Sequence, residues 1–151
     1  MSDTNSMNDI RRHDIPESKA AQVYRHVVFD GDYVFIAGQL ASDRTNPPPQ
    51  LGDIETETRT AMELLGAALR SVGLDFTDVM QARVFMTDLS EFARMNKVYS
   101  SFFPTGETPA RTCVGVANLL NGCKIEIDFV ARMRKFDSAK HLGAPRVEVA
   151  R

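Results

Sequence analysis

The chain has 151 residues, of which 43% are hydrophobic and 25% charged, and its formal net charge at pH 7 is −2. This length favours a single domain with a substantial core, and the composition is that of an ordinary soluble globular protein. The slight negative charge argues against a nucleic-acid-binding protein, which would normally carry a basic excess or stripe. No apolar run approaches the roughly 18 residues of a membrane-spanning helix. The N-terminus lacks the apolar segment of a signal peptide, so we expect a cytoplasmic protein without a membrane partner.

The two ends of the chain differ in pattern from its middle. Residues 1–18 are polar and carry no hydrophobic periodicity, which predicts a flexible N-terminal arm. The folded domain is expected over residues 19–134. Residues 135–151 lose the pattern again, so we expect a loosely attached C-terminal tail.

The folded part begins with a predicted β-hairpin. Residues 24–29 and 33–37 are rich in β-branched and aromatic side chains, and they flank the turn sequence Asp-Gly-Asp. Gly38 follows the second strand, and a glycine there permits close approach of a partner or ligand to the backbone. The loop over residues 41–52, with its three consecutive prolines, is expected to belong to neither a strand nor a helix.

A first amphipathic helix is expected after this loop. Asp53 is its candidate N-cap, and Gly73 is its candidate stop. The apolar stripe that predicts its buried face comprises Ile54, Ala61, Met62, Leu65, Ala68, Leu69 and Val72. The face expected to meet solvent comprises Glu55, Glu57, Arg59, Glu63 and Arg70.

A strand over residues 79–87 and a second helix are expected next. In the strand, Met80, Ala82, Val84 and Met86 share one face. Asp88 and Glu91 have the spacing of a capping box, and the helix should end near Phe103. Its expected core stripe comprises Phe92, Met95, Tyr99 and Phe102. Asn96 lies between core residues of this helix although asparagine is a poor helix former, so we expect its side chain to make a specific hydrogen bond rather than simply to meet solvent.

Residues 109–132 hold two alternating runs on either side of a turn at 118–122, and this pattern predicts a second hairpin. One face of the first run carries Arg111, Cys113 and Gly115, and one face of the second carries Glu126 and Asp128. A cross-strand ion pair on a solvated face is one explanation of these charges. A surface that a ligand or partner approaches closely is the other.

The order ββαβαββ predicts an α+β fold in which one mixed sheet carries two helices on one face. The opposite face, expected to hold Arg111, Cys113, Gly115, Glu126 and Asp128, would then be uncovered, which favours a closed homo-oligomer. In a simple hairpin, Arg111 and Glu126 would stand about 20 Å apart along the ladder. They could therefore cooperate only in another strand arrangement or from different chains.

The two cysteines, Cys113 and Cys123, are not expected to pair in a reducing compartment. Without a nearby pair of histidines they do not predict a zinc site. Cys123 is best explained as a small buried hydrophobic residue. Cys113 is less settled because it shares a face with Arg111.

The strings PARTCVGVA and KIEIDFVA resemble the signature of the RidA/YjgF family, the reactive-intermediate (enamine/imine) deaminases. The resemblance extends to Tyr24, to Ala-Gly-Gln at 37–39 and to FMTDLSEFARMNKVYSSFF at 85–103, and it spans about residues 22–133. It implies the chorismate-mutase-like fold and a homotrimer with clefts between subunits. It also implies a role in metabolite damage control, without a metal or another cofactor.

The resemblance further implies that Arg111 grips a substrate carboxylate, for which a guanidinium offers a bidentate fork. Glu126 would hold or activate the attacking water. The other implied cleft residues are Tyr24, Gly38 through its backbone N–H, Asn96 and Cys113. The implied reaction is the hydrolysis of a 2-imino or enamine acid, such as 2-aminoacrylate or 2-aminocrotonate, to a 2-keto acid and ammonia.

The sequence departs from the family pattern at several places and leaves the substrate open. Ala37 stands where the family often has serine, and Leu120 where it usually has proline. A pathway-specific imine, as in aminomuconate or aminoacrylate catabolism, is one alternative. A non-catalytic, regulatory trimer that binds small carboxylates is another. Ribonuclease or translation-inhibitor activity, reported for some relatives, is disfavoured because no basic groove or aromatic stacking platform is visible.

Overall fold

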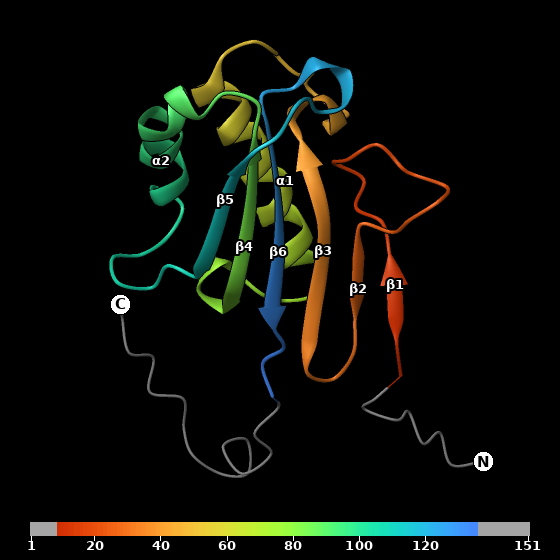
Figure 1. The fold of residues 1–151 in the computed structure, drawn as a ribbon. Coiled ribbons are helices and arrows are strands. Elements are labelled where there is room, and N and C mark those ends of the chain that lie inside the picture. Colours follow the sequence, from red (N-terminus) through yellow and green to blue (C-terminus); the bar gives the residue numbers. More distant parts are fainter. Residues whose placement is uncertain (1–8, 136–151) are drawn as a thin grey trace, which may run out of the picture.

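The computed structural model describes residues 9–135 and forms one six-stranded mixed sheet with two α-helices on one face (Figure 1). The strands are β1 (Arg11–His13), β2 (Val27–Phe29), β3 (Tyr33–Leu40), β4 (Val79–Met86), β5 (Ala110–Gly115) and β6 (Ile125–Arg132). The helices are α1 (Ile54–Ser71) and α2 (Phe92–Ser100). The strand order is β1-β2-β3-β6-β4-β5, and only β4 and β5 pair in parallel. The predicted α+β class is confirmed.

Local sequence chemistry sets the first turns. The Asp30 carboxylate accepts hydrogen bonds from the backbone N–H groups of Asp32 and Tyr33, which closes the predicted hairpin between β2 and β3. The Asp53 carboxylate accepts from the N–H of Thr56 at 2.9 Å and caps α1. Gly73, with φ of 76°, follows the end of this helix in the left-handed conformation.

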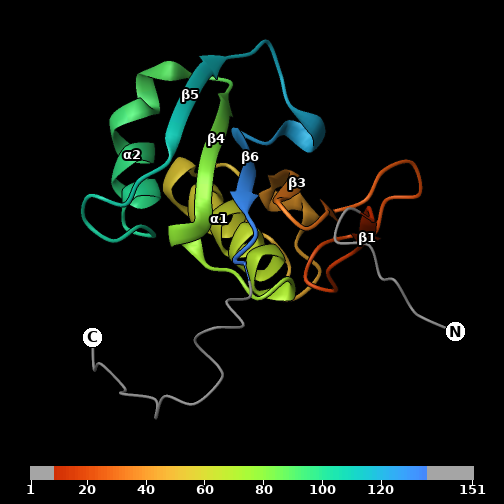
Figure 2. The same cartoon turned by 90° about the horizontal axis from the view of Figure 1, so that it is seen from below.

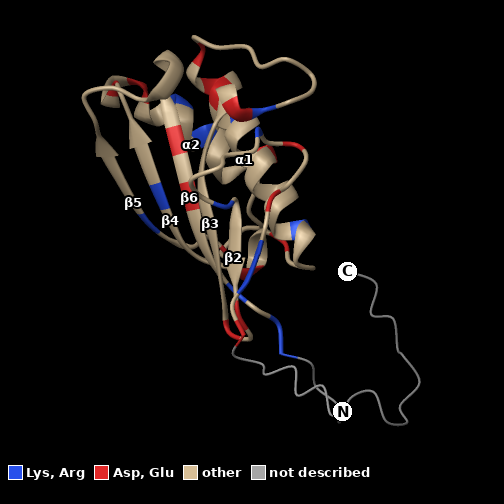
Figure 3. Cartoon of the chain, turned by 90° about the vertical axis from the view of Figure 1, so that its right-hand side faces the viewer, with Lys and Arg blue, Asp and Glu red and all other residues tan. Residues whose placement is uncertain are grey.

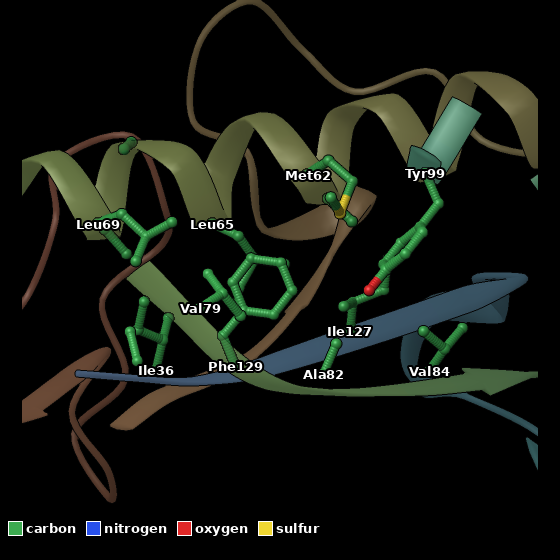
Figure 4. Close-up of a cluster of buried hydrophobic side chains, with 14 of the residues drawn as sticks. Ile36, Met62, Leu65, Leu69, Val79, Ala82, Val84, Tyr99, Ile127 and Phe129 are labelled. Atoms are coloured by element: carbon green, nitrogen blue, oxygen red, sulfur yellow. The ribbon is translucent and has the colours of Figure 1, made fainter. Parts of the chain in front are cut away.

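The core lies between the sheet and α1. Met62, Leu65 and Leu69 of α1 pack over Ile127 and Phe129 of β6 (Figure 4). Figure 2, seen from below the view of Figure 1, shows α2 beside β5 and α1 against the central strands. Burying one side chain of this size stabilises the fold by about 1.5–3 kcal/mol. Within residues 9–135, no helix has the length and hydropathy to cross a membrane.

The predicted second hairpin is wrong, because β4 lies between β5 and β6. The connection from β5 passes over the end of β4, where the N–H of Val116 donates to the carbonyl of Met86 at 2.8 Å. Beyond the connection, the N–H of Thr87 donates to the carbonyl of Lys124 at 3.1 Å. The chain therefore enters β6 on the far side of β4.

The expected common face for the charged residues of β5 and β6 is also wrong. Arg111, Cys113 and Gly115 pair with the buried Ala82, Val84 and Met86 of β4, so they face the helices. Glu126 and Asp128 pair with Phe85 and Arg83, on the open face. Figure 3 shows the acidic residues of β6 and the basic residue of β4 within the sheet.

Three assignments to helix or strand faces need correction. Glu57, expected in solvent, is fully buried, and its carboxylate accepts from the N–H groups of Gly52 at 2.8 Å and Lys124 at 2.9 Å. Met80 is 45% exposed because a register shift between Val79 and Gln81 turns it away from the core. Phe92, expected in the core, is 39% exposed.

The start of α2 differs in detail from the predicted capping box. Asp88 caps a 3₁₀ turn over Leu89–Glu91 by accepting from the N–H of Ser90, and α2 follows this turn. The Glu91 carboxylate instead accepts from the Lys124 ammonium at 2.7 Å.

The N-terminal segment is part of the domain from Arg11 onward, so the expected arm to residue 18 is wrong for residues 11–18. β1 pairs with β2, Ile15 is 2% exposed within the core, and Ser18 is 4% exposed. Residues 1–8 of the expected arm and all but the first residue of the expected tail lie outside the described residues.

Candidate functional site

Arg111 lies on β5 and is held from the side of α2. Its Nη1 donates to the Oδ1 of Asn96 at 2.7 Å. Its guanidinium carbon lies 4.8 Å from the ring centroid of Tyr99 and 5.4 Å from that of Phe92. The spacing of Phe92, Asn96 and Tyr99 along α2 presents all three to the same strand. The expected hydrogen bond of Asn96 is thus found.

These contacts orient the guanidinium while leaving it able to bind an anion. A cation over an aromatic face is stabilised by about 0.5–2 kcal/mol, depending on its hydration. Asn96 occupies one N–H of Arg111, and the side chain makes no further hydrogen bond to residues 9–135. A cavity of about 500 Å³ opens beside it. The arrangement is suited to a planar anion such as a carboxylate.

The two groups next to Arg111 that carry a labile proton are held in their neutral forms. Burial raises the pKa of Tyr99 to about 12, although the charge of Arg111 opposes this. Burial also raises the pKa of the Cys113 thiol, again against the effect of Arg111. A thiol with a raised pKa that packs against the core is a poor nucleophile. Cys113 is therefore placed to pack beside Arg111 rather than to attack a substrate.

Glu126 lies on β6, opposite Leu40 of β3. Gly38 occupies the register shift of β3 between Ile36 and Gln39, and a Cβ atom at Gly38 would clash with Oε1 of Glu126. A larger residue at this position would force the carboxylate of Glu126 to move. This gives the sequence Ala-Gly-Gln a structural reason.

Glu126 has acidic neighbours. Burial raises its pKa, and the charges of Asp43 and Asp128 add to this effect. The Asp43 carboxylate accepts from the N–H of Leu40, the residue opposite Glu126, at 2.9 Å. Tyr24 is 47% exposed, and its pKa is raised by burial and by Asp43 and Glu126. Tyr24, Asp43 and Glu126 therefore share one acidic environment.

Within one chain, the predicted site residues fall into two separate groups. Arg111, Asn96 and Cys113 lie on the helix side at the edge of the sheet, whereas Tyr24, Gly38 and Glu126 lie near β3 and β6. Arg111 pairs with Ala82 of β4, and Glu126 pairs with Phe85 of the same strand. Two strand spacings and three residues separate their Cα atoms by about 14 Å, and the side chains leave opposite faces. One chain does not bring them together.

Sequence reasoning missed several residues around both groups. Phe92 and Tyr99 stack on Arg111, although their helical spacing is equally typical of a core stripe. Asp43 was not singled out, and nothing in its local sequence distinguishes it from a loop aspartate. Arg83 pairs with Asp128 through both carboxylate oxygens, at 3.0 and 2.6 Å. That pair would be suggested only by knowing that β4 and β6 are neighbours.

The chain is similar in sequence and fold to known proteins. The family model described as endoribonuclease L-PSP matches residues 15–133. Protein DfrA of Myxococcus xanthus is 40% identical over 77% of this chain and 84% of its own length. The 2-iminobutanoate/2-iminopropanoate deaminase of Rattus norvegicus is 32% identical over 88% of this chain and 98% of its own length. The crystal structure of E. coli TdcF with bound serine superposes with a TM-score of 0.73 and 30% identity, covering 82% of this chain and 100% of that one.

Proposed function

The chain belongs to the YjgF/RidA family, that of the endoribonuclease L-PSP model, and from this premise we propose that it hydrolyses 2-imino acids and their enamine tautomers to 2-keto acids and ammonia. The observation that carries the proposal is the oriented guanidinium of Arg111 with a cavity beside it. Substrates such as 2-aminoacrylate and 2-aminocrotonate offer the carboxylate that this guanidinium fits.

The proposal requires more than one copy of the chain, because Arg111 and Glu126 leave opposite faces of the sheet. We infer a closed homotrimer in which the Arg111 group of one copy faces the Glu126 group of its neighbour. The open sheet face supports assembly: Phe35 is 53% and Val114 40% exposed there. Such apolar exposure on one face of a sheet is typical of a surface buried between subunits.

In this assembly, Arg111 binds the substrate carboxylate and fixes the position of C2. The Glu126 carboxylate orients a water molecule and accepts its proton as the water oxygen bonds to C2. This proton passes from Glu126 to the nitrogen, the proton of the new C2 hydroxyl follows, and the C2–N bond breaks so that ammonia leaves and the C2 carbonyl forms. Each turnover consumes one imine and one water and yields one keto acid and one ammonia. The Tyr24 hydroxyl and the Gly38 N–H are assigned to contacts with the bound substrate.

The raised pKa of Glu126 supports its role as a base. A general base works best when its pKa lies near the working pH, and an ordinary glutamate is too acidic for that. Asp43 contributes to this shift while its own carboxylate accepts a hydrogen bond from the N–H of Leu40. We therefore assign Asp43 as a positioning residue that tunes Glu126.

The direct test is a coupled assay in which a dehydratase generates the enamine and the formation of keto acid is timed. Arg111→Ala should remove the acceleration, because an uncharged side chain cannot replace a bidentate charged pair. Arg59→Ala removes the same charge from the exposed face of α1 and should retain the wild-type rate. Wild-type acceleration by Arg111→Ala would refute the proposal.

A non-catalytic carboxylate-binding trimer is the second candidate, because Arg111 alone would suffice for binding. The TdcF structure holds serine, a carboxylate-bearing molecule. Calorimetry with 2-oxobutanoate separates the two functions. If this chain binds 2-oxobutanoate through Arg111 but does not accelerate imine hydrolysis, binding is its function.

A further inference from the structure

The cavity beside Arg111 is built from one face of α2 and the segment that enters β5. Four of its lining residues, Ala93, Asn96, Lys97 and Ser100, follow helical spacing along α2. The opposite face of the helix, with Met95 and Val98, is buried. Lys97 is thus directed to the same space as Arg111 by the geometry of the helix.

The charged residues that line this cavity are all basic. Arg111 and Lys97 line it, and no lining residue is acidic. On the helix side, Glu91 is paired with Arg94 and Lys124. Glu107, next to the lining residue Thr108, makes no ion pair within 4.0 Å among residues 9–135, and neither does Lys97. Among the residues that line the cavity, Arg111 and Lys97 therefore have no acidic partner.

In a single chain, the cavity is also larger than a small imino acid needs. Its volume is about 500 Å³, within the range of about 300–1,000 Å³ typical of sites for much larger ligands. A monocarboxylate bound to Arg111 would leave Lys97 unpaired. A second carboxylate on the substrate would satisfy both cations at once.

Resting on the proposed function, we propose that this site prefers imino acids with two carboxylates, such as the imines of glutamate and aspartate. The C1 carboxylate binds Arg111, and the distal carboxylate binds Lys97. Water adds at C2, the C2–N bond breaks and ammonia leaves, so that 2-iminoglutarate and water yield 2-oxoglutarate and ammonia. Reactions that oxidise the α-carbon of acidic amino acids supply such imines.

The two cations suit these different tasks. Asn96 and two aromatic rings fix Arg111, which makes it the anchor for the carboxylate next to the reacting carbon. Lys97 is exposed and carries a compact charge on a flexible stem, so it can follow substrates of different length. Because solvent screens an exposed charge, we expect its effect on selectivity to be moderate.

The test compares two imines made in the assay by amino-acid oxidases, one from L-glutamate and one from L-2-aminobutyrate. The free imine is trapped with semicarbazide, and kcat/KM is obtained for each substrate. We expect the wild-type ratio to favour the dicarboxylate. Lys97→Gln should lower this ratio about tenfold, equivalent to about 1.4 kcal/mol. Lys97→Arg should largely preserve it, and Lys135→Gln, which removes a lysine charge on the segment after β6, should leave it unchanged.

A second readout does not depend on turnover. The wild-type chain should bind 2-oxoglutarate more tightly than 2-oxobutanoate, and Lys97→Gln should abolish the difference. If the wild-type chain accelerates hydrolysis of neither imine, the proposed function fails and the substrate preference fails with it. If it accelerates the monocarboxylate reaction but Lys97→Gln changes neither the ratio of the two kcat/KM values nor the ratio of the two keto-acid affinities, the hydrolase stands and the dicarboxylate preference is overturned.

Discussion

Glu57 and Glu126 are carboxylates with different surroundings and therefore different tasks. Glu57 is fully buried, and its carboxylate accepts hydrogen bonds from two backbone N–H groups. One belongs to the loop before α1, and the other to the residue preceding β6. Glu126 is half-buried beside two further carboxylates. The first surrounding gives Glu57 a structural role, and the second favours a group that takes up and releases a proton.

Replacing Glu57 tests its structural role. In Glu57→Ala, the N–H groups of Gly52 and Lys124 lose their acceptor while remaining partly buried. We expect the free energy of unfolding to fall by about 2–4 kcal/mol, measured by urea denaturation. Glu57→Gln keeps one acceptor oxygen and should lose less. The matched control is Glu63→Ala on the same helix, whose side chain is 53% exposed and should change stability by less than about 0.5 kcal/mol.

Replacing Glu126 should have the opposite effect on stability to replacing Glu57, because of how Glu126 titrates. Its pKa in the folded chain is raised above the ordinary value of 4.5, so the folded state favours the protonated form. The stability linked to this proton is fully present below that ordinary value and is lost as the pH rises through the folded-state pKa. Glu126→Gln, which is always neutral, should therefore be more stable than wild type at neutral pH. The difference should disappear in acid.

Urea denaturation of both proteins across this pH range measures the difference. The same linkage predicts the activity profile: in Asp43→Asn, one cause of the raised pKa of Glu126 is removed, so the acidic limb of kcat/KM should move to lower pH. A limb that does not move in Asp43→Asn would show that another group sets it.

At the scale of single residues, the sequence indicates some roles and conceals others. Asn96 stood out because a poor helix former lay between core residues, and its bond to Arg111 explains it. Glu57 did not stand out, because its charge matched the solvated face and one of its two N–H donors, that of Lys124, lies far away in the sequence. Aromatic residues at helical spacing predict packing without saying whether the partner is a leucine or a guanidinium.

At the scale of elements, alternation predicts strands and the faces of strands but not their neighbours. Both runs of residues 109–132 are strands, yet β4 lies between them. The turn residues at 118–122 indicate a reversal of direction, which the chain makes while passing over β4. A hairpin was the most local solution. The actual pairing depends on long-range contacts that no short window of sequence contains.

The N-terminal segment has a polar sequence that did not predict its place in the fold. Two of its isoleucines, one buried and one exposed, test whether the segment is anchored in the core. Ile15 is 2% exposed in the core, whereas Ile10 is 59% exposed. Ile15→Ala should lower the free energy of unfolding by about 2–4 kcal/mol, through lost burial and the cavity left behind. Ile10→Ala should change it by less than about 0.5 kcal/mol. Thermal and urea denaturation of both variants measure the contrast, and equal effects would mean that Ile15 does not anchor the segment.

At the scale of the whole molecule, the separation of Arg111 from Glu126 makes assembly part of the chemistry. If each site takes Arg111 from one copy and Glu126 from its neighbour, two inactive variants should restore one another. In mixed trimers of Arg111→Ala and Glu126→Ala, some sites receive the intact arginine from one chain and the intact glutamate from the other. Random assembly gives about one quarter of such sites.

The complementation experiment mixes the two variants after unfolding, refolds them together and times imine hydrolysis. We expect about one quarter of the wild-type rate above the activity of either variant alone, in a sample that sediments as a trimer. Each variant refolded separately is the control for recovery of the fold. If each site took Arg111 and Glu126 from the same chain, mixing the two variants could not restore a complete site. The absence of complementation in a stable mixed trimer would therefore refute the shared site. A sample that sediments as a monomer at micromolar concentration would refute the assembly itself.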